Sequence, residues 1–263
     1  MLRPFDRSGW FARRHQRRSR PRRPAMIELA LALERRELLS GSSGGDFLPA
    51  NPDVARNNGP QSQLVIRANF QNQSLDLAEF SDTNIRAAMS SVNQFFVRQS
   101  FGTLSFPDNQ LTIVSGAVTL PFTKAQIENA GAAGAPSDAN DAIHDQAEAL
   151  ATTLGFNMAD YLHVTVLFPD SGGRIGYAGL AQVPGQRLWM NGNIDVDVWS
   201  HELGHNAGAP HVGYFETANP NAAIQDANQM TFFEGGTGLD VMGGGGTSLL
   251  DPRKSDMACQ VLS

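Results

Sequence analysis

The chain has 263 residues, enough for one domain with a sizeable core and an appendage. Its net charge of −6 hides an asymmetry, because residues 1–36 carry 11 of the 20 Lys and Arg but only 3 of the 26 Asp and Glu, so that this head has a charge of +8 and the remainder −14. An acidic body has no basic surface for a phosphate backbone, and nucleic acid is therefore excluded as an expected partner.

The basic head, residues 1–40, has two interpretations. It is either a disordered or nucleic-acid-binding arm, or an export segment in which charged residues precede the short apolar stretch Ala25–Leu33. The sequence LERRELLS at its end is similar to an N-terminal segment of exported bacterial proteins, and we therefore expect a secreted protein. No apolar run reaches the length that spans a bilayer, which predicts no integral membrane segment.

Residues 41–62 are rich in Gly, Ser, Pro and Asn and predict a linker, so that the folded domain is expected to occupy residues 63–263. Apolar residues three and four apart predict its helices, and β-branched apolar runs predict its strands. The alternation of strands with helices predicts an α/β (α+β) fold with a mixed sheet and packed helices. In chain order we expect a strand at 63–70, a helix at 81–100 with Ile85, Met89, Val92 and Phe96 buried, a strand at 111–120 broken by a glycine, a helix at 137–155 with Ile143, Ala147, Leu150 and Leu154 buried, and a strand at 161–168.

The stretch HELGHNAGAPH holds three of the six histidines and predicts a zinc site. On a helix, His201 and His205 lie one turn apart on one face, where both imidazoles can bind one ion. Glu202 lies beside the first of them and can act as a general base toward water at the metal. Gly208 can end the helix and turn the chain, which brings His211 back as a third ligand. Three protein ligands leave one position open, as in catalytic rather than structural zinc sites.

Chance is a poor explanation for this pattern. With this composition a bare HExxH arises somewhere in the chain with odds of about one in a few hundred, and the full HExxHxxGxxH with odds on the order of one in a hundred thousand. The extended motif resembles the zinc signature of the metzincin metallopeptidases. That resemblance implies one catalytic Zn²⁺, a twisted mixed sheet, and a methionine turn beneath the metal, for which Met242 is the candidate in GLDVMGGGG.

Two further segments, 93–106 and 177–192, extend the resemblance to the gametolysin-like peptidases, over about residues 60–250. The chain also departs from the metzincin pattern. Gly244 stands where some members have a tyrosine, and only 21 residues follow Met242, which implies a short C-terminal subdomain. The single cysteine, Cys259, excludes an intrachain disulfide, and no cysteine precedes the motif that could silence the zinc.

Other polar residues are expected to be structural. His144 and His163 are predicted to be satisfied core histidines, because three ligands are already found. Segment 191–198 lacks the spacing of a calcium loop, and either Asp195 or Asp197 is expected to cap the zinc helix instead.

These patterns predict a zinc-dependent endopeptidase with a polypeptide substrate, and the resemblance implies extracellular or cell-wall proteins as targets. We expect the substrate to pair with an edge strand formed by Gly179, Leu180 and Ala181, where side-chain changes should have mild effects. One alternative is a catalytically inactive metzincin fold that serves binding or adhesion. Another is a peptidase restricted to short peptides. The oligomeric state is left open.

Overall fold

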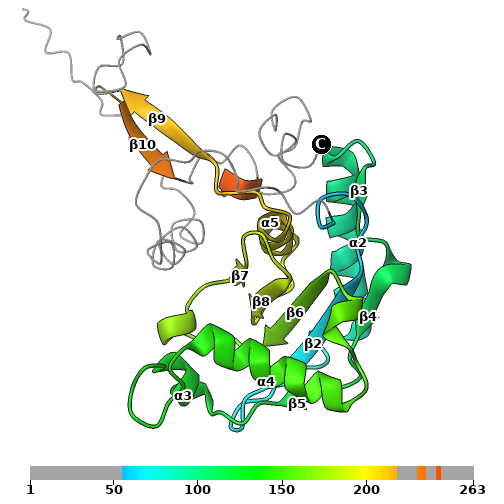
Figure 1. The fold of residues 1–263 in the computed structure, drawn as a ribbon. Coiled ribbons are helices and arrows are strands. Elements are labelled where there is room, and N and C mark those ends of the chain that lie inside the picture. The colour runs from blue at the N-terminus through cyan, green and yellow to red at the C-terminus, as the bar shows by residue number, and fades with distance from the viewer. Residues whose placement is uncertain (1–54, 218–229, 235–240, 244–263) are drawn as a thin grey trace, which may run out of the picture.

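The structure is a computed structural model that describes residues 55–217, 230–234 and 241–243, and every structural statement below concerns these residues. A twisted sheet forms the centre, with helices packed against both of its faces (Figure 1). The predicted α+β class is therefore confirmed. None of the described helices is both long and apolar enough to cross a membrane.

The central sheet has six strands in the order β4-β2-β6-β8-β7, with β5 also pairing with β2. All neighbouring strands run parallel except β7, which is antiparallel to β8 and ends the order. Parallel strands with helices on both faces are buried on both sides, which explains why every residue of β6 is buried. The strands are β2 (Gln63–Asn69), β4 (Leu111–Ile113), β5 (Val118–Thr119), β6 (His163–Phe168), β7 (Gly179–Ala181) and β8 (Arg187–Asn191).

Two apolar layers hold the helices on the sheet. Helices α2 (Asp82–Gln99) and α5 (Val196–Asn206) cover one face, where Trp199 and Leu203 pack with Leu167. Helices α3 (Lys124–Glu128) and α4 (Ala139–Thr153) cover the other face (Figure 1). Burying each large apolar side chain contributes about 1.5–3 kcal/mol, so both layers stabilise the sheet that carries the site.

The remaining elements are short. They are the parallel pair β1 (Gly59–Pro60) and β3 (Leu104–Ser105), the 3₁₀ turns η1 (Asp108–Gln110), η2 (Met158–Asp160), η3 (Gly173–Ile175) and η5 (Val241–Gly243), and the antiparallel pair β9 (Gly213–Thr217) and β10 (Met230–Glu234).

The predicted elements are found close to their expected positions, with one difference. The strand expected at 111–120 is broken at a glycine as predicted, because β4 and β5 lie on either side of Gly116, which has a positive φ of 72°. Leu154, expected in the core, is 57% exposed because α4 ends at Thr153 and Leu154 is its C-cap. One turn after Ala147, on the same face of the helix, Ala151 is buried instead.

The folded chain includes residues 59–62, which their composition had assigned to a linker. The Gly59 amide donates to the Thr103 carbonyl at 2.7 Å and the Gln61 amide donates to the Ser105 carbonyl at 2.8 Å. The Gln61 side chain is fully buried. Composition does not predict that this segment is folded, because its backbone pairs with a partner more than forty residues away. The predicted head, residues 1–40, lies outside the described residues.

A partly buried ionic cluster joins α4 to β8. Glu148 accepts from His144 Nδ1 at 2.8 Å, and from Arg187 Nε and Nη2 at 3.1 and 2.8 Å. Burial raises the pKa of the Glu148 carboxyl, but the hydrogen bonds from His144 and Arg187 outweigh it, and the net pKa lies below its ordinary value. Burial also lowers the pKa of His144 below its ordinary value, despite the neighbouring carboxylate.

These pKa shifts predict that the fold is sensitive to acid. Because both folded-state pKa values are depressed, the unfolded chain binds more protons, and stability is lost as the pH falls. The loss begins near the ordinary histidine value of 6.5 and continues below the ordinary glutamate value of 4.5. Glu148→Gln should lower the free energy of unfolding at pH 7.5 by about 1–3 kcal/mol, with a smaller difference from wild type at pH 4.

Urea unfolding at several pH values in the presence of a chelator measures both effects. Glu79→Gln makes the same chemical change at an exposed residue and should follow the wild-type curve. If the free energy of unfolding falls by the same amount between pH 7.5 and pH 4 in Glu148→Gln and in wild type, this cluster is not the source of the acid sensitivity.

Candidate metal centre

The helix that carries the motif, α5, begins at a side-chain cap. Asp195 Oδ1 accepts from the backbone N–H groups of Asp197 at 2.8 Å and Val198 at 3.2 Å. Of the two candidates for the cap, Asp195 is therefore the one. A carboxylate at this position satisfies two N–H groups that have no partner within the helix and interacts favourably with the helix dipole.

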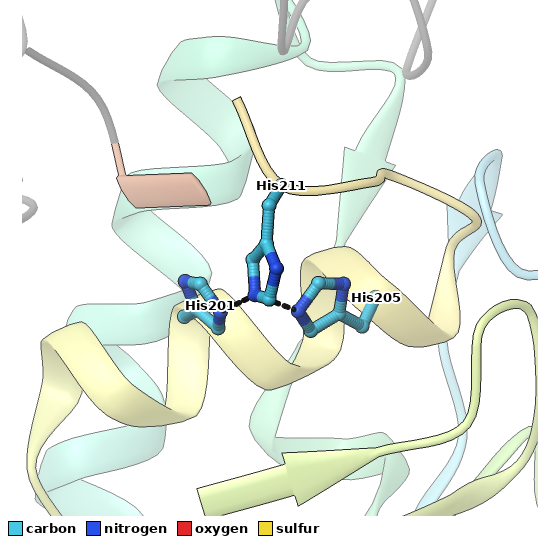
Figure 2. A group of neighbouring side chains, drawn as sticks. All are labelled: His201, His205 and His211. Carbon is cyan, nitrogen blue, oxygen red and sulfur yellow. Dashed lines mark hydrogen bonds between the residues drawn. The ribbon is translucent and has the colours of Figure 1, made fainter. Parts of the chain in front are cut away.

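Helix α5 ends at Gly208, as the sequence predicts. Gly208 has a φ of +99°, its N–H donates to the His205 carbonyl at 2.8 Å, and the N–H of Ala209 donates to the Gly204 carbonyl at 2.9 Å. This pair of bonds is the Schellman motif, which requires a left-handed residue and therefore favours glycine. The chain reverses there and carries His211 back over the helix (Figure 2).

The three motif histidines point toward one another (Figure 2). His211 Nε2 lies 3.2 Å from His201 Nε2 and 3.0 Å from His205 Nε2. A tetrahedral site with zinc–nitrogen bonds of about 2.0–2.1 Å separates its nitrogens by about 3.3 Å. The spacing of the two measured pairs therefore fits the ligands of one such ion.

Hydrogen bonds on the far side of two rings determine which nitrogens can bind a metal. His201 Nδ1 donates to the Val241 carbonyl at 2.7 Å, and His205 Nδ1 donates to the Ala209 carbonyl at 2.8 Å. A carbonyl only accepts, so in each neutral ring the proton lies on Nδ1 and Nε2 presents a lone pair. These two lone pairs converge on His211 Nε2, and one cation bound among the three nitrogens could accept a lone pair from each ring. These three residues thus fit a metal ion, and they are the group among the described residues that could hold one.

Neither carbonyl could be predicted from the sequence, because each is a backbone group with no residue-type signature. The turn that ends the helix brings the Ala209 carbonyl to His205. The Val241 carbonyl lies 40 residues from His201 in sequence and reaches it only in the folded chain. Val241 belongs to η5, next to the predicted Met-turn residue. Its carbonyl therefore joins the segment that contains Met242 to a candidate metal ligand.

Met242 lies against α5, close to the segments that carry the three clustered histidines. It is buried, and a Cβ added at Gly204 would lie 2.6 Å from Met242 Sδ. The Met242 carbonyl accepts from the N–H of Val212, the residue after the third histidine, at 3.2 Å. Gly204 is thus needed for close approach, and a glycine inside an otherwise regular helix was the available sequence signal. Gly244 and the expected C-terminal subdomain lie outside the described residues.

We predict that Gly204→Ala destabilises the protein, against the helix propensities. In an exposed helix the change would stabilise by up to about 1 kcal/mol, but here the methyl group meets buried Met242 and overpacking typically costs about 1–3 kcal/mol. Thermal unfolding of the metal-free protein shows whether Gly204→Ala lowers or raises the melting temperature. The same Gly204→Ala change should cost less in a Met242→Ala background than in wild type, because the clashing side chain is gone. A rise in melting temperature for Gly204→Ala alone would contradict this packing.

Glu202 lies on the side of α5 that faces β7. Its side chain is almost fully buried, and a Cβ added at Gly179 would lie 2.8 Å from Glu202 Cγ and 2.9 Å from Glu202 Oε1. The expectation of mild side-chain effects is therefore wrong for Gly179, since even a methyl group there meets Glu202 and Val198. The absence of a side chain at Gly179 is what lets this carboxylate lie against the strand.

Among the described strands, β7 has no partner on its outer side. It is the last strand in the order of the central sheet, and Leu180 is paired opposite Trp189 of β8. Ala178 and Gln182 are joined to β8 by hydrogen bonds at 3.1 Å each, so by alternation the backbone groups of Leu180 face β8 and those of Gly179 and Ala181 face away from it. The three residues predicted to bind substrate thus divide into one that is paired within the sheet and two with outward backbone groups.

The other two described histidines do not belong to the cluster, as predicted. His144 pairs with Glu148 on the α4 face of the sheet. His163 is fully buried between Gln61 and Asn206.

The sequence and the structure were compared with known proteins. No family model and no curated protein matches the chain. A solved structure of a chaperone–substrate complex aligns with 63% of this chain at 14% sequence identity and a TM-score of 0.37. The chain spans 27% of the length of that match.

Proposed function

We propose that the protein is a zinc-dependent endopeptidase of the metzincin type. The observation that supports this most is the convergence of three imidazole Nε2 atoms, two of them with the tautomer fixed by Nδ1–carbonyl hydrogen bonds. The full HExxHxxGxxH pattern at these residues supports the choice of zinc.

His201, His205 and His211 would hold the ion. When bound at an open three-histidine site, zinc supplies Lewis acidity toward a carbonyl oxygen and makes water more acidic. The Val241 and Ala209 carbonyls keep the first two rings in their metal-binding tautomer, since a bonded second nitrogen fixes ring orientation.

Glu202 is the proposed general base. It follows a ligand directly on the helix, is not a member of the ligand group, and lies in a buried setting that strengthens its electrostatic interactions. In the reaction its carboxylate oxygen would take a proton from the attacking water and deliver it to the leaving amine nitrogen. Contact with Gly179 restricts where that carboxylate can lie.

A peptide would bind in extended form along β7. The outward backbone groups of Gly179 and Ala181 offer donors and acceptors to an antiparallel peptide, as at other open sheet edges. Because the strand touches Glu202, a peptide paired there would pass beside the proposed base. We further propose that the enzyme is secreted by a bacterium and acts on extracellular or cell-wall proteins. This rests on the sequence resemblance alone.

Loss of one ligand should abolish stoichiometric zinc binding. Purified wild-type protein should carry about one zinc per chain, and His211→Gln should weaken binding by more than about 100-fold, the upper range for loss of mere outer-shell support. His144→Gln is the matched control, because His144 lies outside the cluster and its loss should leave zinc content unchanged. Metal analysis and chelator competition measure both. Full zinc affinity in His211→Gln would show that the three-histidine site is wrong.

Replacing the base separates a peptidase from an inactive binding module. Glu202→Gln keeps nearly the same shape but lacks a basic carboxylate, so zinc content and melting temperature should persist while kcat falls by at least about 10²–10⁴-fold. Cleavage of a mixed peptide library is the assay, and Glu79→Gln is the control. Unchanged cleavage by zinc-loaded Glu202→Gln would remove Glu202 from the mechanism. Absence of cleavage by both zinc-loaded forms would favour the binding module.

A further inference from the structure

A row of buried polar side chains lies beneath the C-terminal end of α5. Gln61, His163 and Asn206 are each fully buried, although they come from the segment after β1, from β6 and from α5. His163 Nε2 lies 3.0 Å from Gln61 Oε1, and His163 Nδ1 lies 3.1 Å from Asn206 Oδ1. The ring therefore bridges two side-chain amides inside the core.

The orientation of both amides is fixed by their other contacts. Asn206 Nδ2 donates to the carbonyls of Gln182 at 3.1 Å and Arg187 at 3.0 Å. Gln61 Nε2 lies within bonding distance of three carbonyls, the nearest being that of Asn58 at 2.9 Å. Turning either amide over would set its oxygen against these carbonyls. Each amide thus presents an oxygen, which can only accept, to His163.

A neutral imidazole has one donor and cannot satisfy two acceptors. One of its nitrogens would then face an amide oxygen lone pair with its own lone pair, at a distance of 3.0 or 3.1 Å. We propose that His163 is a buried imidazolium, protonated on both ring nitrogens, that fixes the Asn206 amide and thereby sets the β7–β8 hairpin against the metal-ligand helix. His163 acts in this arrangement as a positioning residue, through its contact with the Asn206 amide.

The surroundings of the ring contain both favourable and opposing groups. Gln63, paired opposite His163 on β2, has a buried Oε1 with no hydrogen-bond partner among the described residues. Phe106 contributes an aromatic ring 5.5 Å from the His163 ring, centre to centre. The Arg56 guanidinium, which donates to the Leu162 carbonyl at 2.9 Å, is a nearby cation that opposes a second charge. On α5, His205 precedes Asn206 and is the nearest titratable residue in sequence.

Desolvation disfavours any buried cation, and the two charge-assisted hydrogen bonds must offset it. His144 shows the opposite balance. It makes one bond of ordinary length, 2.8 Å to Glu148, while its other nitrogen lies 3.3 Å from the Leu188 carbonyl, and Arg187 already neutralises the carboxylate. One proton is enough there, and burial lowers the pKa of His144.

The consequence concerns the proposed substrate edge. Asn206 contacts the hairpin through three hydrogen bonds, from its Nδ2 to the Gln182 and Arg187 carbonyls and from the Gly185 N–H to its own carbonyl at 3.2 Å. Asn206 directly follows the second ligand, His205. Orienting its amide therefore orients the edge strand relative to the metal centre. This structural inference does not depend on the protein being a peptidase.

Nitrogen-15 NMR of the histidine rings tests the protonation state without any substitution. In wild-type protein at pH 7, with or without zinc, both nitrogens of His163 should show the chemical shift and attached proton of an imidazolium. His144 in the same spectrum should show one protonated nitrogen and serves as the internal control. A single proton on the His163 ring would overturn the proposal.

Hydrogen exchange tests the positioning role. His163→Leu removes both donors, and exchange at the Gly185 and Gln182 amides should accelerate by at least about tenfold, the factor for one hydrogen bond to a charged group. Thr165→Val is the matched control, because Thr165 Oγ1 is buried in the same strand with no partner among the described residues. Equal exchange in the two variants would overturn the role of His163.

If His163→Leu does not fold, Gln61→Met removes only the acceptor opposite Nε2. The His163 ring should then lose the proton on Nε2 and keep the proton on Nδ1, which faces Asn206. An imidazolium that persists unchanged in Gln61→Met at pH 7 would overturn the proposed donor–acceptor balance.

Discussion

The site depends on hydrogen bonds from the outer nitrogens of two imidazoles to backbone carbonyls. They place the Nδ1 protons of His201 and His205 on the Val241 and Ala209 carbonyls, which leaves the inner nitrogens as acceptors. Backbone carbonyls are held by the fold itself, so the metal-binding tautomer does not rely on a flexible partner. The helix cap, the Schellman turn and η5 all serve to hold these carbonyls and rings at their distances.

Close packing around α5 relies on two residues without side chains. Gly204 gives space to Met242 on one side of the helix, and Gly179 gives space to Glu202 on another. In both cases a methyl group would fall within 3 Å of a heavy atom. Close-packed protein interiors are hardly compressible, so a shift of one side chain moves its neighbours. The position of the carboxylate is thus coupled to the edge strand, and that of the methionine to the ligand helix.

Donor–acceptor balance distinguishes the buried histidines that look alike in composition. Around the cluster, acceptor nitrogens converge and a metal ion can satisfy them together. Around His163, amide oxygens lie on both sides and two protons are required. Around His144, a carboxylate lies 2.8 Å from one nitrogen and the Leu188 carbonyl lies 3.3 Å from the other, while an arginine balances the charge of the carboxylate. We therefore propose that the same side chain serves as a metal ligand, a cation or a neutral donor according to what its two nitrogens face.

The sequence by itself determined the features that arise within a few residues. Helical spacing placed His201 and His205 on one face, Gly208 ended the helix, and apolar patterns predicted the strands and helices of the sheet. Tertiary structure decided which distant groups meet them. The Val241 carbonyl reaches His201 across 40 residues and Gln61 reaches His163 across 102, and these contacts depend on strand order and helix packing. Local periodicity reports which face of an element is apolar, but it carries no information on which partner that face will meet.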